Sequence, residues 1–163
     1  MKPGTMGTSS PSAAENAWSL SWPEPDIALL TFDLPGKGAN VLSRSVLAEL
    51  REHLEALHAR KDVAGLVIKS GKPGTFIAGA DLREFVAQLN APKDQVVALC
   101  QTGQSLFGML SKTPFVTVAA IDGICVGGGS ELACWCDRRI VSTHPKTEIG
   151  FPEVKLGLYP GWG

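Results

Sequence analysis

I-D-G-I-C-V-G-G-G-S-E-L-A, residues 121–133, is the stretch of this 163-residue sequence that decides the fold. A run with strand character ends at three consecutive glycines, Gly127 to Gly129, and a helix is expected to begin at about Gly129. Glu131 falls on the first turn of that helix. Backbone N–H groups at a helix start can stabilise a developing oxyanion. The stretch therefore predicts a strand–turn–helix unit with a chemical site at the turn.

A second turn of small residues, A-G-A-D from Ala78 to Asp81, lies between an expected strand and an expected helix. Taken alone, it is most simply a strand-to-helix turn in which Asp81 caps the helix. Glu153, in the downstream G-F-P-E, is by itself most simply a solvated loop charge. The run Gly127 to Gly129 does not match a nucleotide-phosphate pattern. Two such turns and two glutamates in this order favour a site where N–H groups hold an acyl oxygen and two carboxylates move protons.

The rest of the sequence alternates between expected strands and expected helices. Strands are predicted at 17–22, 27–33, 64–70, 115–121 and 139–143, and helices at 43–60, at 93–111 and at 129–136. Residues 76–80 are expected to lead into a further helix near Asp81. The helix at 93–111 is expected to bury Val96, Val97, Leu99, Cys100, Leu106 and Leu110. This alternation indicates an α/β domain with βαβ crossovers, although the sequence shows no internal repeat.

Composition and charge limit the classes of function. Charged residues make up 19% of the chain and the formal net charge is -1, which gives no reason to expect a nucleic-acid partner. No apolar stretch approaches the roughly 18 residues of a membrane span. Residues 1–16 are expected to form a disordered leader without the apolar core of a secretory signal.

Cysteines and tryptophans are expected to serve packing and not chemistry. The C-x-C pair at Cys134 and Cys136 has no second pair and no histidine cluster nearby, so neither a zinc site nor any other metal site is predicted. Reduced thiols in apolar surroundings favour a reducing, cytoplasmic location. The residues concerned are Cys100, Cys125, Cys134, Cys136, Trp18, Trp22, Trp135 and Trp162.

Three segments together resemble one protein family. F-I-A-G-A-D, I-D-G-I-C-V-G-G-G-S-E-L-A and G-F-P-E-V-K-L-G-L-Y-P-G-W-G are similar to motifs of the crotonase, or enoyl-CoA hydratase/isomerase, superfamily and occur in the family's order. The resemblance runs from about Ala17 to the last residue. The P-K-T run and the 22-residue step from Glu131 to Glu153 look most like the hydratase/isomerase region of multifunctional fatty-acid β-oxidation α-subunits.

The resemblance implies a fold, a substrate and a set of site residues. The fold would be a spiral of ββα repeats, assembled as trimers or pairs of trimers, and the substrate an acyl-CoA thioester with no cofactor. The implied site consists of the amides of Ala80 and Gly128 as an oxyanion hole, Ala78, Gly79 and Asp81 along the acyl-CoA path, and Glu131 and Glu153 as catalytic acid/base residues.

Three functions are compatible with these residues. Two glutamates favour a 2-enoyl-CoA hydratase of fatty-acid β-oxidation, whereas a Δ3-Δ2-enoyl-CoA isomerase can work with one. The third is a truncated fragment that binds acyl-CoA or a partner subunit without catalysis, because the sequence stops at Gly163 within an expected loop. We therefore expect residues 17–163 to be the N-terminal part of a crotonase-like domain, incomplete at its C-terminus and in its full form a homo-oligomer or part of a multifunctional complex.

Overall fold

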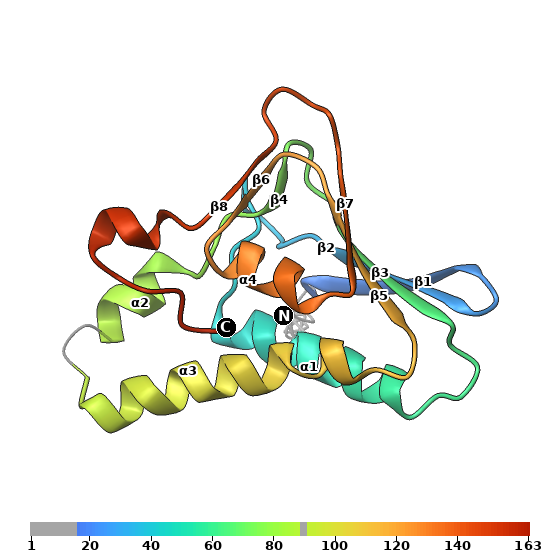
Figure 1. Ribbon diagram of the computed structural model, residues 1–163, viewed down its shortest axis with the longest axis horizontal. Coiled ribbons are helices and arrows are strands. Elements are labelled where there is room, and N and C mark those ends of the chain that lie inside the picture. The colour runs from blue at the N-terminus through green and yellow to red at the C-terminus, as the bar shows by residue number, and fades with distance from the viewer. Residues whose placement is uncertain (1–15, 89–90) are drawn as a thin grey trace, which may run out of the picture.

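The computed structural model describes residues 16–88 and 91–163, so nearly all of the expected leader lies outside the described residues (Figure 1). Five strands form a large sheet in the order β1-β2-β3-β5-β7. The pair β1–β2 is antiparallel and the other pairs are parallel. The five strands are Trp18–Glu24 (β1), Ile27–Phe32 (β2), Gly65–Ser70 (β3), Val116–Ile121 (β5) and Arg138–Val141 (β7).

A second, smaller sheet holds three parallel strands in the order β4-β6-β8. These are Thr75–Ile77 (β4), Ile124–Val126 (β6) and Glu148–Gly150 (β8). Three successive strand pairs therefore each place their first strand in the large sheet and their second strand in the small one. This arrangement, with the helices that follow the pairs, confirms the predicted α/β spiral of ββα units. The repeat lies in the backbone path, which is why the sequence itself shows none.

Four α-helices and two 3-10 turns complete the described part of the chain. Their bounds are Arg44–His58 (α1), Leu82–Gln88 (α2), Lys93–Phe107 (α3), Gly128–Trp135 (α4), Leu110–Lys112 (η1) and Pro152–Leu156 (η2). The hydroxyl of Ser43 accepts the N–H of Val46 at 3.3 Å and so caps α1 as predicted. One face of α1 is buried, through Val46, Leu50, Leu54 and Leu57.

The core lies largely between α1 and the large sheet. Trp18 is buried there and stacks on Phe32 with ring centroids 4.3 Å apart, and its indole N–H donates to the carbonyl of Val46. Trp22, Trp135 and Trp162 pack as partly buried side chains against the same core. The packing role predicted for the tryptophans is therefore what the structure shows.

Helix α3 is shorter and less buried than the sequence predicts. It ends at Phe107, and the chain continues into η1. Val96 and Val97 are 40% and 43% exposed, whereas Leu106 and Phe107 are buried. The N-terminal half of α3 extends away from the large sheet (Figure 1). The prediction that Val96 and Val97 are buried is wrong because only the C-terminal half of α3 reaches the core.

The four cysteines differ in their surroundings. Cys125 and Cys136 are buried and Cys100 is half-buried, but Cys134 is exposed, so its predicted apolar environment is wrong. Cys134 lies on the face of α4 that turns away from the core, while Leu132 and Ala133 face it. Burial raises the pKa of the Cys125 thiol to about 11 and that of Cys136 to about 12.

Among residues 16–88 and 91–163, no three His, Cys, Asp or Glu side chains come together as metal ligands would. No helix in that part of the chain combines the length and the apolar character needed to span a bilayer.

Candidate active site

The two glycine turns singled out in the sequence lie against each other. Strands β4 and β6 are parallel neighbours, with Ile77 paired to Cys125, so the turns that follow them meet at one edge of the small sheet. A Cβ placed on Gly127 would lie 3.6 Å from the Cα of Gly79. Both glycines have positive φ, +52° at Gly127 and +90° at Gly79. The backbone conformation of both turns thus favours glycine at these positions.

The N–H of Ala80 is turned away from its backbone neighbour Leu42. The N–H of Leu42 donates to the carbonyl of Gly79 at 2.9 Å, and that of Asp81 donates to the carbonyl of Leu42 at 3.0 Å. A trans peptide holds its C=O and N–H on opposite sides, so the Ala80 N–H points away from Leu42. Strand β6 and Gly127 lie on that side, and no described residue accepts a hydrogen bond from this N–H.

The N–H of Gly128 is the second donor at this edge. Helix α4 begins at Gly128, one residue earlier than predicted, and Gly127 is its N-cap. The N–H of Gly127 donates to the carbonyl of Gly150 at 3.0 Å, whereas that of Gly128 has no acceptor among the described residues. The first N–H groups of a helix lack partners within it and carry the positive end of the helix dipole. Gly128 therefore presents a donor suited to a negatively charged oxygen.

Glu131 lies one turn into α4 and is only 3% exposed. Its Oε1 accepts the backbone N–H of Trp162 at 2.5 Å. Burial raises the pKa of this carboxyl above the usual range of a glutamate, and the nearby charge of Glu153 acts in the same direction. The backbone N–H groups of Trp162 and Gly163 oppose the shift. Glu131 is thus a buried carboxyl whose pKa is raised, chiefly by its burial.

Glu153 is carried by η2, immediately after β8. Its Oε1 lies 2.7 Å from the position that a Cβ on Gly127 would occupy. Its Oε2 is buried and has no hydrogen-bond partner among the described residues. An unpartnered buried carboxylate oxygen is costly in a structural role. Glu153 is therefore not a solvated loop charge, and its carboxylate faces the junction of the two glycine turns.

The sequence model of the enoyl-CoA hydratase/isomerase family matches residues 24–163. This chain belongs to the enoyl-CoA hydratase/isomerase family. The fatty acid oxidation complex subunit alpha of Aliivibrio fischeri is 43% identical over 152 residues, which are 91% of this chain and 22% of that protein.

Solved hydratases share the fold. The crystal structure of enoyl-CoA hydratase from Bacillus anthracis has a TM-score of 0.79 and 28% identity, over 90% of this chain and 55% of that one. An enoyl-CoA hydratase from Shewanella pealeana has a TM-score of 0.80 and 26% identity, over 90% of this chain and 53% of that one. The family member described here spans about a fifth of the length of the curated relatives and about half of these hydratase chains.

The other predicted site residues of this family member lie along the first of the two glycine turns, Ala78 to Asp81. Ala78 donates its N–H to the carbonyl of Asn40 at 2.8 Å, and Gly79 is buried against β6. Asp81 accepts the N–H of Arg83 at 2.8 Å and so caps α2. The capping role predicted for Asp81 from its position is present, and its role along an acyl-CoA path stays a prediction.

Two residues at the site were missed by the sequence analysis. Trp162 was predicted to pack, and its indole does meet Phe107 edge-on with ring centroids 5.6 Å apart. Its backbone N–H, however, is the donor to Glu131, and a backbone donor leaves no signal in the residue type. Asn40, which no sequence pattern singles out, is fully buried beside the Ala78–Asp81 turn.

We expect Glu131→Gln to stabilise the fold by an amount that increases with pH. The unfolded chain releases the Glu131 proton at an ordinary glutamate pKa, whereas the folded chain keeps it to a higher pH. Between these two pKa values the folded state binds more protons, so the stability of the wild type falls as pH rises. Glutamine is neutral throughout, and its side-chain oxygen still accepts the N–H of Trp162.

Urea unfolding of both proteins between about pH 4 and about pH 8 checks this expectation. The wild type should lose stability relative to Glu131→Gln as pH increases. A difference in unfolding free energy that stays constant across this range would contradict the raised pKa.

Proposed function

We propose that this chain carries the reaction centre of a 2-enoyl-CoA hydratase of fatty-acid β-oxidation. The observation that carries the proposal is the buried Glu131 and the half-buried Glu153, whose Oε2 is buried, beside two backbone donors with no described acceptor, those of Ala80 and Gly128. Membership of the enoyl-CoA hydratase/isomerase family and the similarity to fatty acid oxidation complex α subunits support it.

The two amides would act on the thioester oxygen. When water adds to a 2-enoyl thioester, a C–O bond forms at the β-carbon and the π electrons move toward the carbonyl, which gives an enolate. The N–H groups of Ala80 and Gly128 would stabilise the negative charge on that oxygen. Removing one such donor typically costs roughly 2.7–4 kcal/mol of barrier.

The two glutamates would move the protons. Glu131 takes a proton from the attacking water, and Glu153 delivers one to the α-carbon, so the net change is the addition of one water. Interacting carboxyls tend to hold different protonation states, which provides a base and an acid in the same pocket. The addition of water transfers no electrons to or from the substrate, so the proposed reaction uses no redox cofactor. Assembly as a homo-oligomer or within a multifunctional complex, and a cytoplasmic location, belong to the same proposal.

The ultraviolet absorbance of a 2-enoyl-CoA mixed with the 163-residue chain tests the proposal. We expect the absorbance of the conjugated thioester to decay as 3-hydroxyacyl-CoA forms. Conversion of a 3-enoyl-CoA to the 2-enoyl isomer, without hydration, would assign the chain as an isomerase instead. Binding without turnover of either thioester would make it a non-catalytic acyl-CoA-binding fragment. Either result would contradict the proposal.

A further inference from the structure

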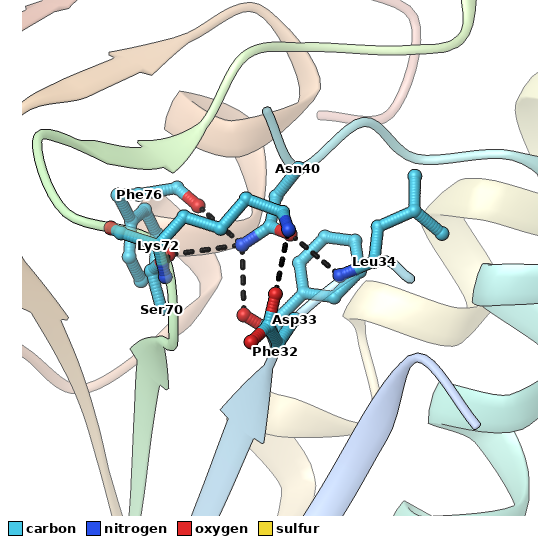
Figure 2. A network of polar contacts seen from close by, with 7 residues as sticks. All are labelled: Phe32, Asp33, Leu34, Asn40, Ser70, Lys72 and Phe76. Atoms are coloured by element: carbon cyan, nitrogen blue, oxygen red, sulfur yellow. Dashed lines mark hydrogen bonds and ion pairs between the residues drawn. The ribbon is translucent and has the colours of Figure 1, made fainter. Parts of the chain in front are cut away.

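Asn40 is a fully buried polar residue, and both polar atoms of its side chain have hydrogen-bond partners. Its Oδ1 accepts the N–H of Leu34 at 2.9 Å. Its Nδ2 donates to the carbonyl of Phe32 at 2.8 Å and to the hydroxyl of Ser70 at 2.9 Å, with the carbonyl of Phe76 a further acceptor at 3.3 Å. Figure 2 shows the amide at the centre of this network.

The network joins the ends of two strands of the large sheet to the middle of one strand of the small sheet. Phe32 ends β2 and Ser70 ends β3 in the large sheet, whereas Phe76 lies in β4 of the small sheet. The ion pair between Lys72 and Asp33, 2.6 Å long, lies beside it (Figure 2). A buried amide is tolerated only when its groups are paired, and a paired network holds its members in one arrangement. Asn40 therefore fixes the local backbone against both sheets.

The backbone of the same segment holds the first glycine turn. The carbonyl of Asn40 accepts the N–H of Ala78 at 2.8 Å. Two residues later, Leu42 donates to the carbonyl of Gly79 and accepts from Asp81, which forms an isolated parallel bridge between Leu42 and Ala80. These bonds determine the direction of the peptide between Gly79 and Ala80, and hence the direction of the Ala80 N–H.

We propose that Asn40 is a positioning residue, which fixes the 40–42 segment so that the Ala80 N–H points at the substrate carbonyl. This inference rests on the proposed function, because it assigns Ala80 as an oxyanion donor. Asn40 acts through the backbone of Ala78 to Asp81. The proposal assigns it no contact with the reacting atoms of the substrate. Its side chain is needed to hold the turn at a fixed distance from Gly128, across the contact between Gly79 and Gly127.

The test measures polarisation of a bound thioester carbonyl. The probe is butanoyl-CoA labelled with carbon-13 at its thioester carbonyl, which cannot be hydrated because it has no C=C bond. We expect the infrared carbonyl stretch to fall to lower frequency on binding to the wild-type chain, and Asn40→Ala to lose most of that shift. For a 2-enoyl-CoA, kcat should fall by about 10–10²-fold with little change in KM, because misplacement by about 1 Å costs that much.

Thr117→Val is the matched control for loss of stability alone. Thr117 is also fully buried, and its hydroxyl donates to Asp137 and accepts the N–H of Asp137, both at 2.9 Å. This variant should lose stability and yet keep the carbonyl shift and kcat. If Asn40→Ala does not fold, Ser70→Ala, which removes one acceptor from the Asn40 amide, should give a smaller loss of the shift.

The outcomes separate the two proposals. A wild-type chain that binds butanoyl-CoA without any carbonyl shift would overturn the oxyanion hole and with it the role of Asn40. A wild-type shift that is retained in full by the folded Asn40→Ala variant, or by Ser70→Ala where the former does not fold, would overturn the role of Asn40 alone.

Discussion

Replacing Glu131 with glutamine is expected to lower the rate of 2-enoyl-CoA hydration by on the order of 10²–10⁴-fold. The substitution keeps the size of the side chain and an oxygen that can accept the N–H of Trp162, but it removes the group that takes the proton from water. Glu131 is buried within α4. Among the described carboxylates, Glu153 is the one whose charge raises the pKa of Glu131. The rate of absorbance decay of a 2-enoyl-CoA measures the effect.

Glu148→Gln provides a matched control for Glu131→Gln. Glu148 lies in β8, close in sequence to Glu153, and its side chain is exposed. The same change of charge at Glu148 should leave hydration within about twofold of the wild type, because the charges of exposed residues are screened by solvent. Undiminished turnover by Glu131→Gln, or equal losses in the two variants, would remove Glu131 from its assigned role.

Gly127→Ala is expected to damage both the fold and the reaction. The added methyl group would lie 2.7 Å from Oε1 of Glu153, so the carboxylate would have to move. In addition, alanine would have to adopt a φ of +52° and a ψ of −126°, a strained conformation that costs on the order of 1–3 kcal/mol. We expect this loss in unfolding free energy together with a fall in kcat of on the order of 10²-fold, since Glu153 and the Gly128 amide would both shift.

Gly36→Ala separates backbone strain from the steric effect at the site. Gly36 also has a positive φ, +64°, but a Cβ there would meet no atom within 4 Å. Its substitution should cost about 1 kcal/mol of stability and leave kcat unchanged. Chemical unfolding and steady-state hydration, measured on both variants, test the distinction. Equal effects on kcat would contradict the placement of Glu153 beside Gly127.

Local patterns in the sequence predicted most of the elements that position the site. The strand–glycine–helix unit at 121–133 places Glu131 on the first turn of α4, where the structure has it. The Ser43 cap and the apolar spacing of α1 were also sufficient to predict that helix and its buried face. These features depend on neighbours within a few residues in the sequence, so their signal is local.

Features that depend on distant segments could not be predicted in the same way. Helix α3 has apolar residues along its whole length, but burial of its N-terminal half requires a neighbour that the described chain does not place there. Asn40 in a loop sequence resembles an ordinary turn residue, and its importance arises only when three strands, β2, β3 and β4, meet around it. The environment of Glu153 depends on Gly127, 26 residues earlier, and on the path of η2.

A crystal structure of the 163-residue chain with a bound acyl-CoA tests the central claim most directly. The claim is that the amides of Ala80 and Gly128 share one acceptor, with Glu131 and Glu153 facing it. The account predicts the thioester oxygen at about 2.7–3.1 Å from both amide nitrogens, and the acyl α- and β-carbons next to the two carboxylates. A thioester oxygen bound elsewhere, or in contact with only one of these amides, would contradict it.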